Sequence, residues 1–265
     1  AFVVLAIGFV ILAKCADIVV DGAVGFAWRL KVPKLIIGIV LVSLATTAPE
    51  LSVSLLSDLQ QEPEMALGNA IGSVICDDGL ALGLAGVISA TPILVIPLVL
   101  KTSGVFLILV ELLLFVFVIF DHTLNRVEGA LLVSLFAAYL VFMYRQHRAG
   151  KFADDPAEDH VEPPAASSLG VLMAMFGLGL LGIVLSSEFI VISATTLADA
   201  AGVPDAVIAL TLVAFGTSIP EVATCVTAAR KNEGAIAVGN ILGADILNIC
   251  WVAGASAIAH DLVLG

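Results

Sequence analysis

Charged residues are scarce in this chain. They make up 13% of its 265 residues, whereas a soluble domain carries roughly 25%. No basic, aromatic-interleaved stretch suggests a nucleic-acid interface, so no nucleic-acid partner is expected. Cysteine occurs only four times, without the C-x-x-C spacing of redox or metal sites. These cysteines are interpreted as small packing residues, and no organic cofactor is predicted.

Apolar residues are abundant instead. They form 60% of the chain, and the mean hydropathy is +1.14. Apolar stretches of roughly 20 residues, long enough to cross a hydrocarbon core of about 30 Å, recur along the sequence. They are too long and too uniformly apolar for the alternating strands of a membrane barrel. The sequence therefore predicts an all-α polytopic membrane protein with eight transmembrane helices, at about residues 2–28, 35–57, 65–90, 103–120, 127–144, 168–196, 204–229 and 234–258.

The distribution of Lys and Arg predicts the orientation, because basic residues remain on the cytoplasmic side of a membrane. If the N-terminus is outside, only Arg126 of the basic residues in the predicted loops falls outside. The opposite orientation would reverse this distribution. The sequence therefore predicts an outer N-terminus and places on the cytoplasmic side Arg29, Lys31, Lys34, Lys101, Arg145, Arg148, Lys151, Arg230 and Lys231.

A polar segment divides the chain into two membrane-embedded halves. It includes the Pro-rich, acidic stretch GKFADDPAEDHVEPPAAS, which carries much of the net charge of −12. Its acidic spacing matches no EF-hand loop, so a solvated tether is favoured over a calcium sensor. The predicted organisation is a first membrane half at 1–144, a cytoplasmic linker at 145–167 and a second membrane half at 168–265.

The two halves contain related segments. Adding 171 to a residue number in the first half gives its counterpart in the second, without a gap, from Pro33 and Pro204 to Ile75 and Ile246. TTAPE is matched by TSIPE, and GNAIGS by GNILGA. An odd number of predicted spans, five, separates the copies, so the second enters the membrane in the opposite sense. The sequence thus predicts an inverted-topology repeat.

Inverted repeats with interrupted helices at matching positions are typical of secondary transporters whose binding site lies near the bilayer midplane. Pro49 and Pro220 occupy such positions, and each frees a backbone carbonyl about one turn earlier in its helix. Free carbonyls beside the carboxylates of Glu50 and Glu221 would suit a cation.

The paired motifs TTAPE…GNAIGSVICDD and GTSIPE…GNILGADILN resemble the alpha repeats of calcium/cation antiporters, the sodium/calcium exchanger superfamily. The resemblance covers nearly the whole chain, with alpha repeats at about 35–85 and 206–256. It implies ten helices in two halves of five, of which eight lie in this chain, so the last two are expected to be missing. It also implies a prokaryotic plasma (inner) membrane protein whose partners are the lipid bilayer and cations, without an obligate protein partner.

Ionisable residues inside a membrane span are costly and by default functional. In both motifs, hydroxyl residues lie three and four positions before the glutamate and therefore share its helical face. Carboxylate and hydroxyl oxygens are the hard ligands that Ca²⁺ and Na⁺ prefer. The predicted metal-ligand set, whose first four members are the central ligands implied by the resemblance, is Glu50, Asp77, Glu221, Asn248, Thr46, Thr47, Ser73, Thr217, Ser218 and Asp245.

Several acids depart from the resembled pattern. Many microbial members of the resembled superfamily have the amide in the first repeat and the acid in the second. This chain has them exchanged, with Asp77 in the first repeat and Asn248 in the second. Asp245 is an extra acid one turn before Asn248, and it could bind the cation, pair with a neighbour or carry a proton. Asp78 lies on a different helical face from Asp77, and no role is assigned to Glu111.

Two further charged positions are interpreted as structural. Lys14 and Asp17 are three residues apart in the first span, which predicts an internal ion pair. Glu188 occupies the position of Asp17 in the second copy.

The leading hypothesis is a secondary active antiporter that exchanges Ca²⁺ for Na⁺. Three or four acids would bind either one divalent ion or several monovalent ions, and the resemblance implies alternating access by sliding of the first and sixth helices. The alternative is H⁺-coupled exchange of Ca²⁺ or another divalent cation; the neutral hydroxyl oxygens modestly favour Na⁺.

Two other classes of function are disfavoured. A cation channel with an acidic selectivity ring is a poor match, because inverted symmetry within one chain builds two alternative gates rather than a through-pore. An intramembrane enzyme with paired aspartates is a poor match, because the aspartates of CDDG are adjacent rather than on facing helices. No enzymatic activity is predicted.

Overall fold

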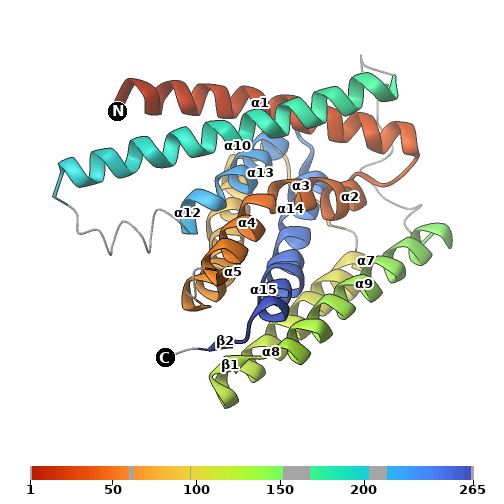
Figure 1. Cartoon of the computed structure of the whole chain (residues 1–265). Coiled ribbons are helices and arrows are strands. Elements are labelled where there is room, and N and C mark those ends of the chain that lie inside the picture. Colours follow the sequence, from red (N-terminus) through yellow and green to blue (C-terminus); the bar gives the residue numbers. More distant parts are fainter. Residues whose placement is uncertain (1, 60–62, 96, 152–167, 203–213, 264–265) are drawn as a thin grey trace.

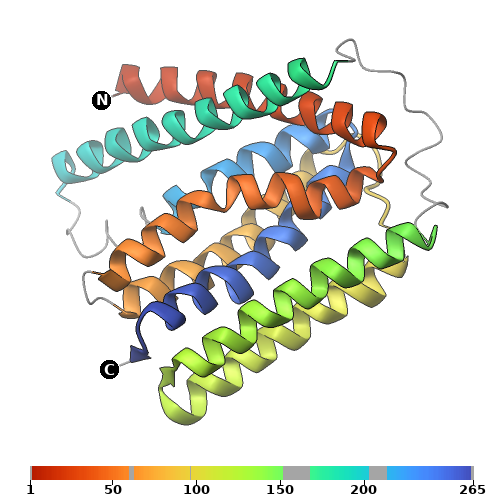
Figure 2. The same cartoon turned by 45° about the vertical axis from the view of Figure 1, so that its right-hand side comes forward.

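The computed structural model describes residues 2–59, 63–95, 97–151, 168–202 and 214–263. These residues are mostly helical, with the helices packed side by side and both chain ends on the same side of the bundle (Figures 1 and 2). Within the described ranges, six helices and one bent helix pair are long and apolar enough to cross a membrane. An all-α polytopic membrane fold is therefore confirmed.

The first half contains five of these candidate spans, several of them composed of consecutive helical segments. Its elements are α1 (Phe2–Leu30), α2 (Lys34–Ile37), η1 (Gly38–Val42), α3 (Ser43–Thr46), α4 (Ala48–Leu59), α5 (Pro63–Cys76), η2 (Asp77–Leu82), α6 (Gly83–Ile88), α7 (Pro97–Val99), η3 (Leu100–Gly104), α8 (Val105–Asp121), β1 (Thr123–Leu124) and α9 (Arg126–Arg148). The segments labelled η are π-helical turns within longer helices.

The second half is shorter. Its elements are α10 (Leu169–Ala200), α12 (Ala214–Thr217), α13 (Ile219–Arg230), α14 (Gly234–Leu247), η5 (Asn248–Ala253), α15 (Gly254–Ala259) and β2 (Leu262–Val263). The span predicted at 204–229 is helical from Ala214, and its beginning lies outside the described residues. Most of the predicted linker also lies outside them, so its properties stay a prediction.

Helices α1 and α10 run alongside each other across one face of the bundle (Figure 2). Their contact uses small residues: a Cβ added to Gly179 would lie 3.1 Å from the backbone oxygen of Cys15. About one turn earlier in α10, the ring of Phe176 meets that of Phe26 edge to face with centroids 5.9 Å apart. Close backbone approach is how membrane helices gain packing contacts, since lipid offers no hydrophobic driving force between them.

Helices α8 and α9 form a hairpin on the opposite face. The start of α9 is fixed by a capping box, in which the Asn125 side chain accepts from the Glu128 N–H and Glu128 accepts from the Asn125 N–H. Strand β1 in the hairpin loop pairs antiparallel with β2 after α15. The hairpin is thereby attached to the end of the second alpha repeat.

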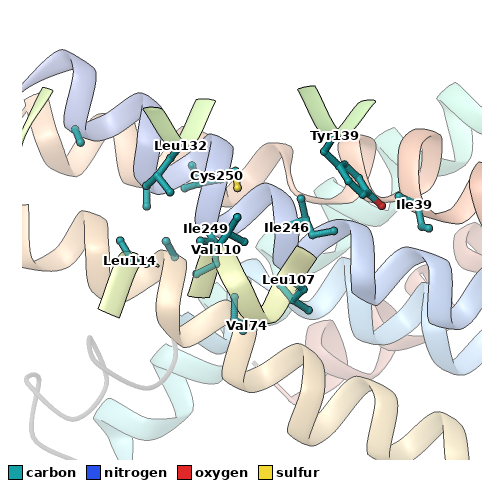
Figure 3. Close-up of a cluster of buried hydrophobic side chains, with 14 of the residues drawn as sticks. Ile39, Val74, Leu107, Val110, Leu114, Leu132, Tyr139, Ile246, Ile249 and Cys250 are labelled. Atoms are coloured by element: carbon teal, nitrogen blue, oxygen red, sulfur yellow. The ribbon is translucent and has the colours of Figure 1, made fainter. Parts of the chain in front are cut away.

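A buried apolar cluster joins this hairpin to the motif helices (Figure 3). Leu107 and Val110 from α8 and Leu132 from α9 pack with Ile246 of α14 and Ile249 of η5. Cys250 is fully buried in the same cluster, and all four cysteines are free thiols. The cluster thus packs the hairpin against one side of the second alpha repeat.

The two repeats touch backbone to backbone where η1 crosses α14. A Cβ added to Gly38 would lie 2.9 Å from both the Gly239 Cα and the Asn240 nitrogen. Such distances leave no room for a side chain at either glycine, because carbon atoms in ordinary contact are about 3.5–4.0 Å apart. This crossing brings the TTAPE motif of the first repeat against the GNILGA motif of the second.

Candidate cation site between the two repeats

Both proline motifs interrupt a helix at the same place. Helix α3 ends at Thr46, and the two parts of this span meet at an angle of 42°. In the second copy, α12 ends at Thr217 and α13 begins at Ile219. The intervening residues have nearly the same backbone, with ψ of 1° at Thr47 and 0° at Ser218. Since a proline lacks the N–H that continues a helix, each break leaves backbone carbonyls available to an ion.

A second pair of irregularities lies at the other predicted ligands. Asp77 is the first residue of the π-helical turn η2, and Asn248 is the first residue of η5. The two turns are repeat counterparts over their whole length, from Asp77/Asn248 to Leu82/Ala253. π-Helical turns inside α-helices occur frequently at functional sites. The inverted repeat is thus present in the backbone geometry as well as in the sequence.

All ten predicted ligand residues are buried. The side chains of Glu50, Asp77, Glu221 and Asp245 are 0% exposed. Such burial is costly unless the charge is neutralised or paired. Buried polar atoms without a hydrogen-bond partner among the described residues include both carboxylate oxygens of Glu50, Asp77 and Asp245, one of Glu221, the hydroxyls of Ser73 and Ser218, and the amide atoms of Asn248. Groups of this kind require an ion, a proton or water.

The threonines of each motif are held by the opposite repeat. Thr46 donates from its hydroxyl to the side-chain oxygen of Asn240 over 3.2 Å, and Thr217 donates to that of Asn69 over 3.2 Å. These two hydrogen bonds are repeat counterparts. A hydroxyl that donates to an amide retains lone pairs for a cation. The sequence marks Asn69 and Asn240 as repeated residues of the Gly-Asn-x-x-Gly motif, but their positioning role emerges only from the structure.

Asn69 also connects the two helices of its own repeat. Its amide nitrogen donates to the backbone oxygen of Glu50 over 3.1 Å and to the Ser54 hydroxyl over 3.0 Å. In the second copy Cys225 replaces Ser54, and the amide nitrogen of Asn240 has no partner among the described residues. The two halves of the site are therefore related but not equivalent.

The central acids of the two repeats converge. The Glu50 carboxyl interacts electrostatically with those of Glu221 and Asp77, and Asp77 also interacts with Glu221. Thr47 donates to an oxygen of Glu221 over 3.3 Å, across the repeat boundary. The structure thus brings residues about 170 positions apart into one acidic centre.

The arrangement of these acids differs from the sequence expectation in one respect. Among the described residues, no group of three or more His, Cys, Asp and Glu side chains is placed to hold one metal ion together. Three or four acids on one divalent ion are therefore not supported. The carboxylates are distributed around the centre instead, so hydroxyl, amide or carbonyl oxygens would have to complete the coordination of a hard cation.

Asp245 connects this centre to a second acidic group. Its carboxyl interacts electrostatically with that of Asp77 and also with those of Asp78 and Glu111. Glu111, which had no assigned role, thus belongs with Asp78 beside the ligand set. The sequence could not reveal this, because Glu111 lies on α8, outside the repeated segments.

The predicted ion pair between Lys14 and Asp17 is wrong. Asp17 interacts instead with Lys231, whose ammonium lies 3.7 Å from the Asp17 carboxylate and 2.6 Å from that of Asp21. Lys231 also donates to the backbone oxygen of Asp17 over 3.0 Å. Residues three apart on a helix can pair, but here a long side chain from the end of α13 reaches both acids of α1.

The fold and this centre define a class: a polytopic helical protein with an inverted repeat and buried acids at the repeat interface, the architecture of secondary transporters. The chain belongs to the sodium/calcium exchanger protein family, which matches residues 1–145 and 171–263. Inner membrane protein YrbG of Escherichia coli (strain K12) is 33% identical over 97% of this chain and 79% of its own length. Sodium/calcium exchanger MaX1 of Methanosarcina acetivorans is 31% identical over 98% of this chain and 83% of its own length.

A solved structure agrees with this assignment. The sodium-calcium exchanger NCX_Mj, in crystals soaked with zero Na⁺ and Ca²⁺, superposes with a TM-score of 0.84 at 29% identity, over 99% of this chain and 83% of that one. The inverted repeat inferred from the sequence is therefore the fold of this family.

Proposed function

We propose that the protein exchanges Ca²⁺ for Na⁺ across the membrane by alternating access to the centre between the two repeats. The observation that carries the proposal is the pair of carboxylates of Glu50 and Asp77, which are fully buried and whose oxygens have no hydrogen-bond partner among the described residues. Structural carboxylates are normally hydrogen-bonded or ion-paired when buried. Buried carboxylates without hydrogen-bond partners, placed where helices are interrupted, are suited to bind a transported cation.

The mixed ligand set supports Na⁺ as the coupling ion. Thr46, Thr47, Thr217 and Ser218 contribute neutral oxygens beside Glu50 and Glu221, and Na⁺ can use such oxygens whereas a proton needs none of them. Because the ions would share ligands, Ca²⁺ and Na⁺ would exclude each other. Mutual exclusion at one centre produces exchange, provided that the empty and strongly negative centre is too costly to reorient.

H⁺-coupled exchange is the second candidate, and the number of acids favours it. Glu50, Asp77, Glu221 and Asp245 carry four formal negative charges, whereas one Ca²⁺ neutralises two. Uncompensated buried charge is strongly unfavourable, so protons or further cations must accompany some transport states.

We further propose a plasma-membrane location in which the side carrying the N-terminus faces outward. The basic residues support this orientation, because Arg29, Lys34, Arg145 and Lys231 lie at the opposite ends of their helices from the N-terminal side. Arg126 is the basic residue on the N-terminal side among the described helix ends.

The decisive experiment is Ca²⁺ flux into proteoliposomes of purified protein, driven first by a Na⁺ gradient and then by a pH gradient in Na⁺-free buffer. We expect Ca²⁺ uptake that requires an outward Na⁺ gradient and reverses with it. Equal flux driven by the pH gradient alone would replace Na⁺ by H⁺. Uptake that follows the Ca²⁺ gradient without any counter-ion would indicate a channel and refute exchange.

A further inference from the structure

A cavity lies beside the candidate cation centre on the side of the N-terminus. It has a volume of about 480 Å³ and is enclosed by α4, α10 and the start of the second motif. Pro49, Pro220 and the proposed ligand Thr217 are among the residues that line it, so the cavity reaches residues adjacent to both central glutamates. Ser52 follows Glu50 along α4, whereas Thr217 precedes Glu221 on an antiparallel segment, and both are therefore on the N-terminal side of the acids.

Among the described residues that line this cavity, the ionisable one is Glu188. It projects from α10 next to the buried Ser187 and is itself exposed. Its carboxylate forms no hydrogen bond or ion pair with any described residue. The other described lining side chains are apolar or neutral, so Glu188 adds an unpaired negative charge at this cavity to that of the buried acids behind it.

The repeat counterpart of Glu188 is in a contrasting state. The carboxylate of Asp17, on α1, lies 3.7 Å from the ammonium of Lys231, which pairs more closely with Asp21 at 2.6 Å and donates to the Asp17 backbone oxygen. Lys231 ends the helix that carries Glu221 and lies on the opposite side from the N-terminus. Of these two equivalent carboxylates, Glu188 is thus exposed on the side with the cavity, and Asp17 is ion-paired on the other side.

From this contrast we propose that Glu188 is the cation-recruiting residue at the entrance on the N-terminal side, and that Asp17, which is ion-paired with Lys231 in this conformation, is its counterpart for the opposite entrance. The proposal rests on the exchange function proposed above. Glu188 is a positioning residue: it raises the local concentration of Ca²⁺ or Na⁺ before the ion reaches Thr217 and the buried acids. A negative charge on a low-dielectric wall attracts cations strongly when little salt screens it.

The test measures exchange in membrane vesicles of known orientation, with Ca²⁺ varied on the side of the N-terminus. For Glu188→Gln at low ionic strength we expect the half-saturating Ca²⁺ concentration to rise by about threefold or more, with a smaller change in the maximal rate. The difference from wild type should shrink as salt is raised, because the screening length falls from about 10 Å at 0.1 M to about 3 Å at 1 M. Glu188→Asp should restore most of the affinity.

Two controls make the result specific. Asp261→Asn removes a carboxylate near β2, on the same side of the protein but away from the cavity, and should leave the half-saturating concentration unchanged. Varying Ca²⁺ on the opposite side should show a smaller effect of Glu188→Gln. The assignment would be overturned if wild-type vesicles exchange ions and Glu188→Gln has the same half-saturating Ca²⁺ concentration as wild type at every ionic strength. Absence of exchange in the wild-type vesicles would instead refute the proposed function.

Discussion

The crossing of η1 over α14 predicts that Gly239→Ala damages both stability and ion binding. The added Cβ would lie 3.1 Å from the Gly38 Cα and from the Ile39 nitrogen, and closer still to the Leu35 oxygen. All three are backbone atoms, which cannot rotate away. Relieving the closest of these contacts requires the two helices to separate by roughly 1 Å, since ordinary contacts of a carbon atom are about 3.5 Å or longer.

The expected cost follows from two opposing terms. Overpacking a well-packed interface costs about 1–3 kcal/mol, and the rigid backbone contacts favour the upper part of that range. Replacing glycine by alanine inside a helix returns about 0.5–1 kcal/mol. The net destabilisation is therefore about 2 kcal/mol, or roughly 4–8 °C in melting temperature for a protein of this size. Asn240 follows the substituted residue and holds Thr46, so Ca²⁺ affinity should also fall.

Thermal unfolding in detergent and calorimetric Ca²⁺ titration would measure both effects. Gly177→Ala is the matched control, because a Cβ at that glycine of α10 meets no described atom within 4 Å. It should melt at or slightly above the wild-type temperature and bind Ca²⁺ normally. If Gly239→Ala melts as high as Gly177→Ala and retains wild-type affinity, the backbone crossing does not position the site.

Three other predictions test the acids and the surrounding charges. Glu50→Gln and Glu221→Gln should each abolish exchange in folded protein, because each removes an anionic oxygen with little change in volume; near-normal flux in either variant would exclude it from the site. Asp245→Asn should weaken Ca²⁺ affinity if that buried acid binds the cation. A stable variant with unchanged affinity would show that Asp245 only pairs with neighbouring residues. Lys34→Met should lower stability by about 1–3 kcal/mol, below the cost for a fully buried pair, since it strips Glu233 of an ammonium 2.6 Å away; a melting temperature equal to that of wild type would contradict this.

Metal binding should also depend on pH. Ligand carboxylates must be ionised to bind Ca²⁺, so binding should release protons and tighten as pH rises. Titrations in buffers of different ionisation enthalpy would measure the released protons, and a proton count of zero at all pH values would contradict the prediction. Competition of this kind is expected for either coupling ion.

Much of the fold was predictable because a membrane imposes strong constraints on sequence. Apolar segments of fixed length and a constant offset of 171 residues indicated the helices and their inverted arrangement. The same offset identified Glu50 and Glu221 as a pair, and both are buried at the interface between the repeats. An acid in an apolar span is costly enough that its presence alone indicates a site.

Long-range partners, by contrast, depended on the tertiary structure. Local spacing suggested that Asp17 pairs with Lys14, but the packing of α1 beside α13 places Lys231 within reach of Asp17 instead. The approach of Glu111 to Asp245 likewise depends on how α8 packs against the second repeat.

The sequence by itself determined the class of protein and the repeat, and it singled out the acids that we propose bind the cation, because hydrophobic length, charge scarcity and internal symmetry are properties of the chain. Only the tertiary structure decided that Thr46 and Thr217 are held by the asparagines of the opposite repeat, and that Glu188 is exposed while its counterpart Asp17 is ion-paired. The physical reason is that these relations arise where the two copies cross or where the symmetry between them is broken. An offset between residue numbers records which positions are equivalent, but not which side of the protein is open.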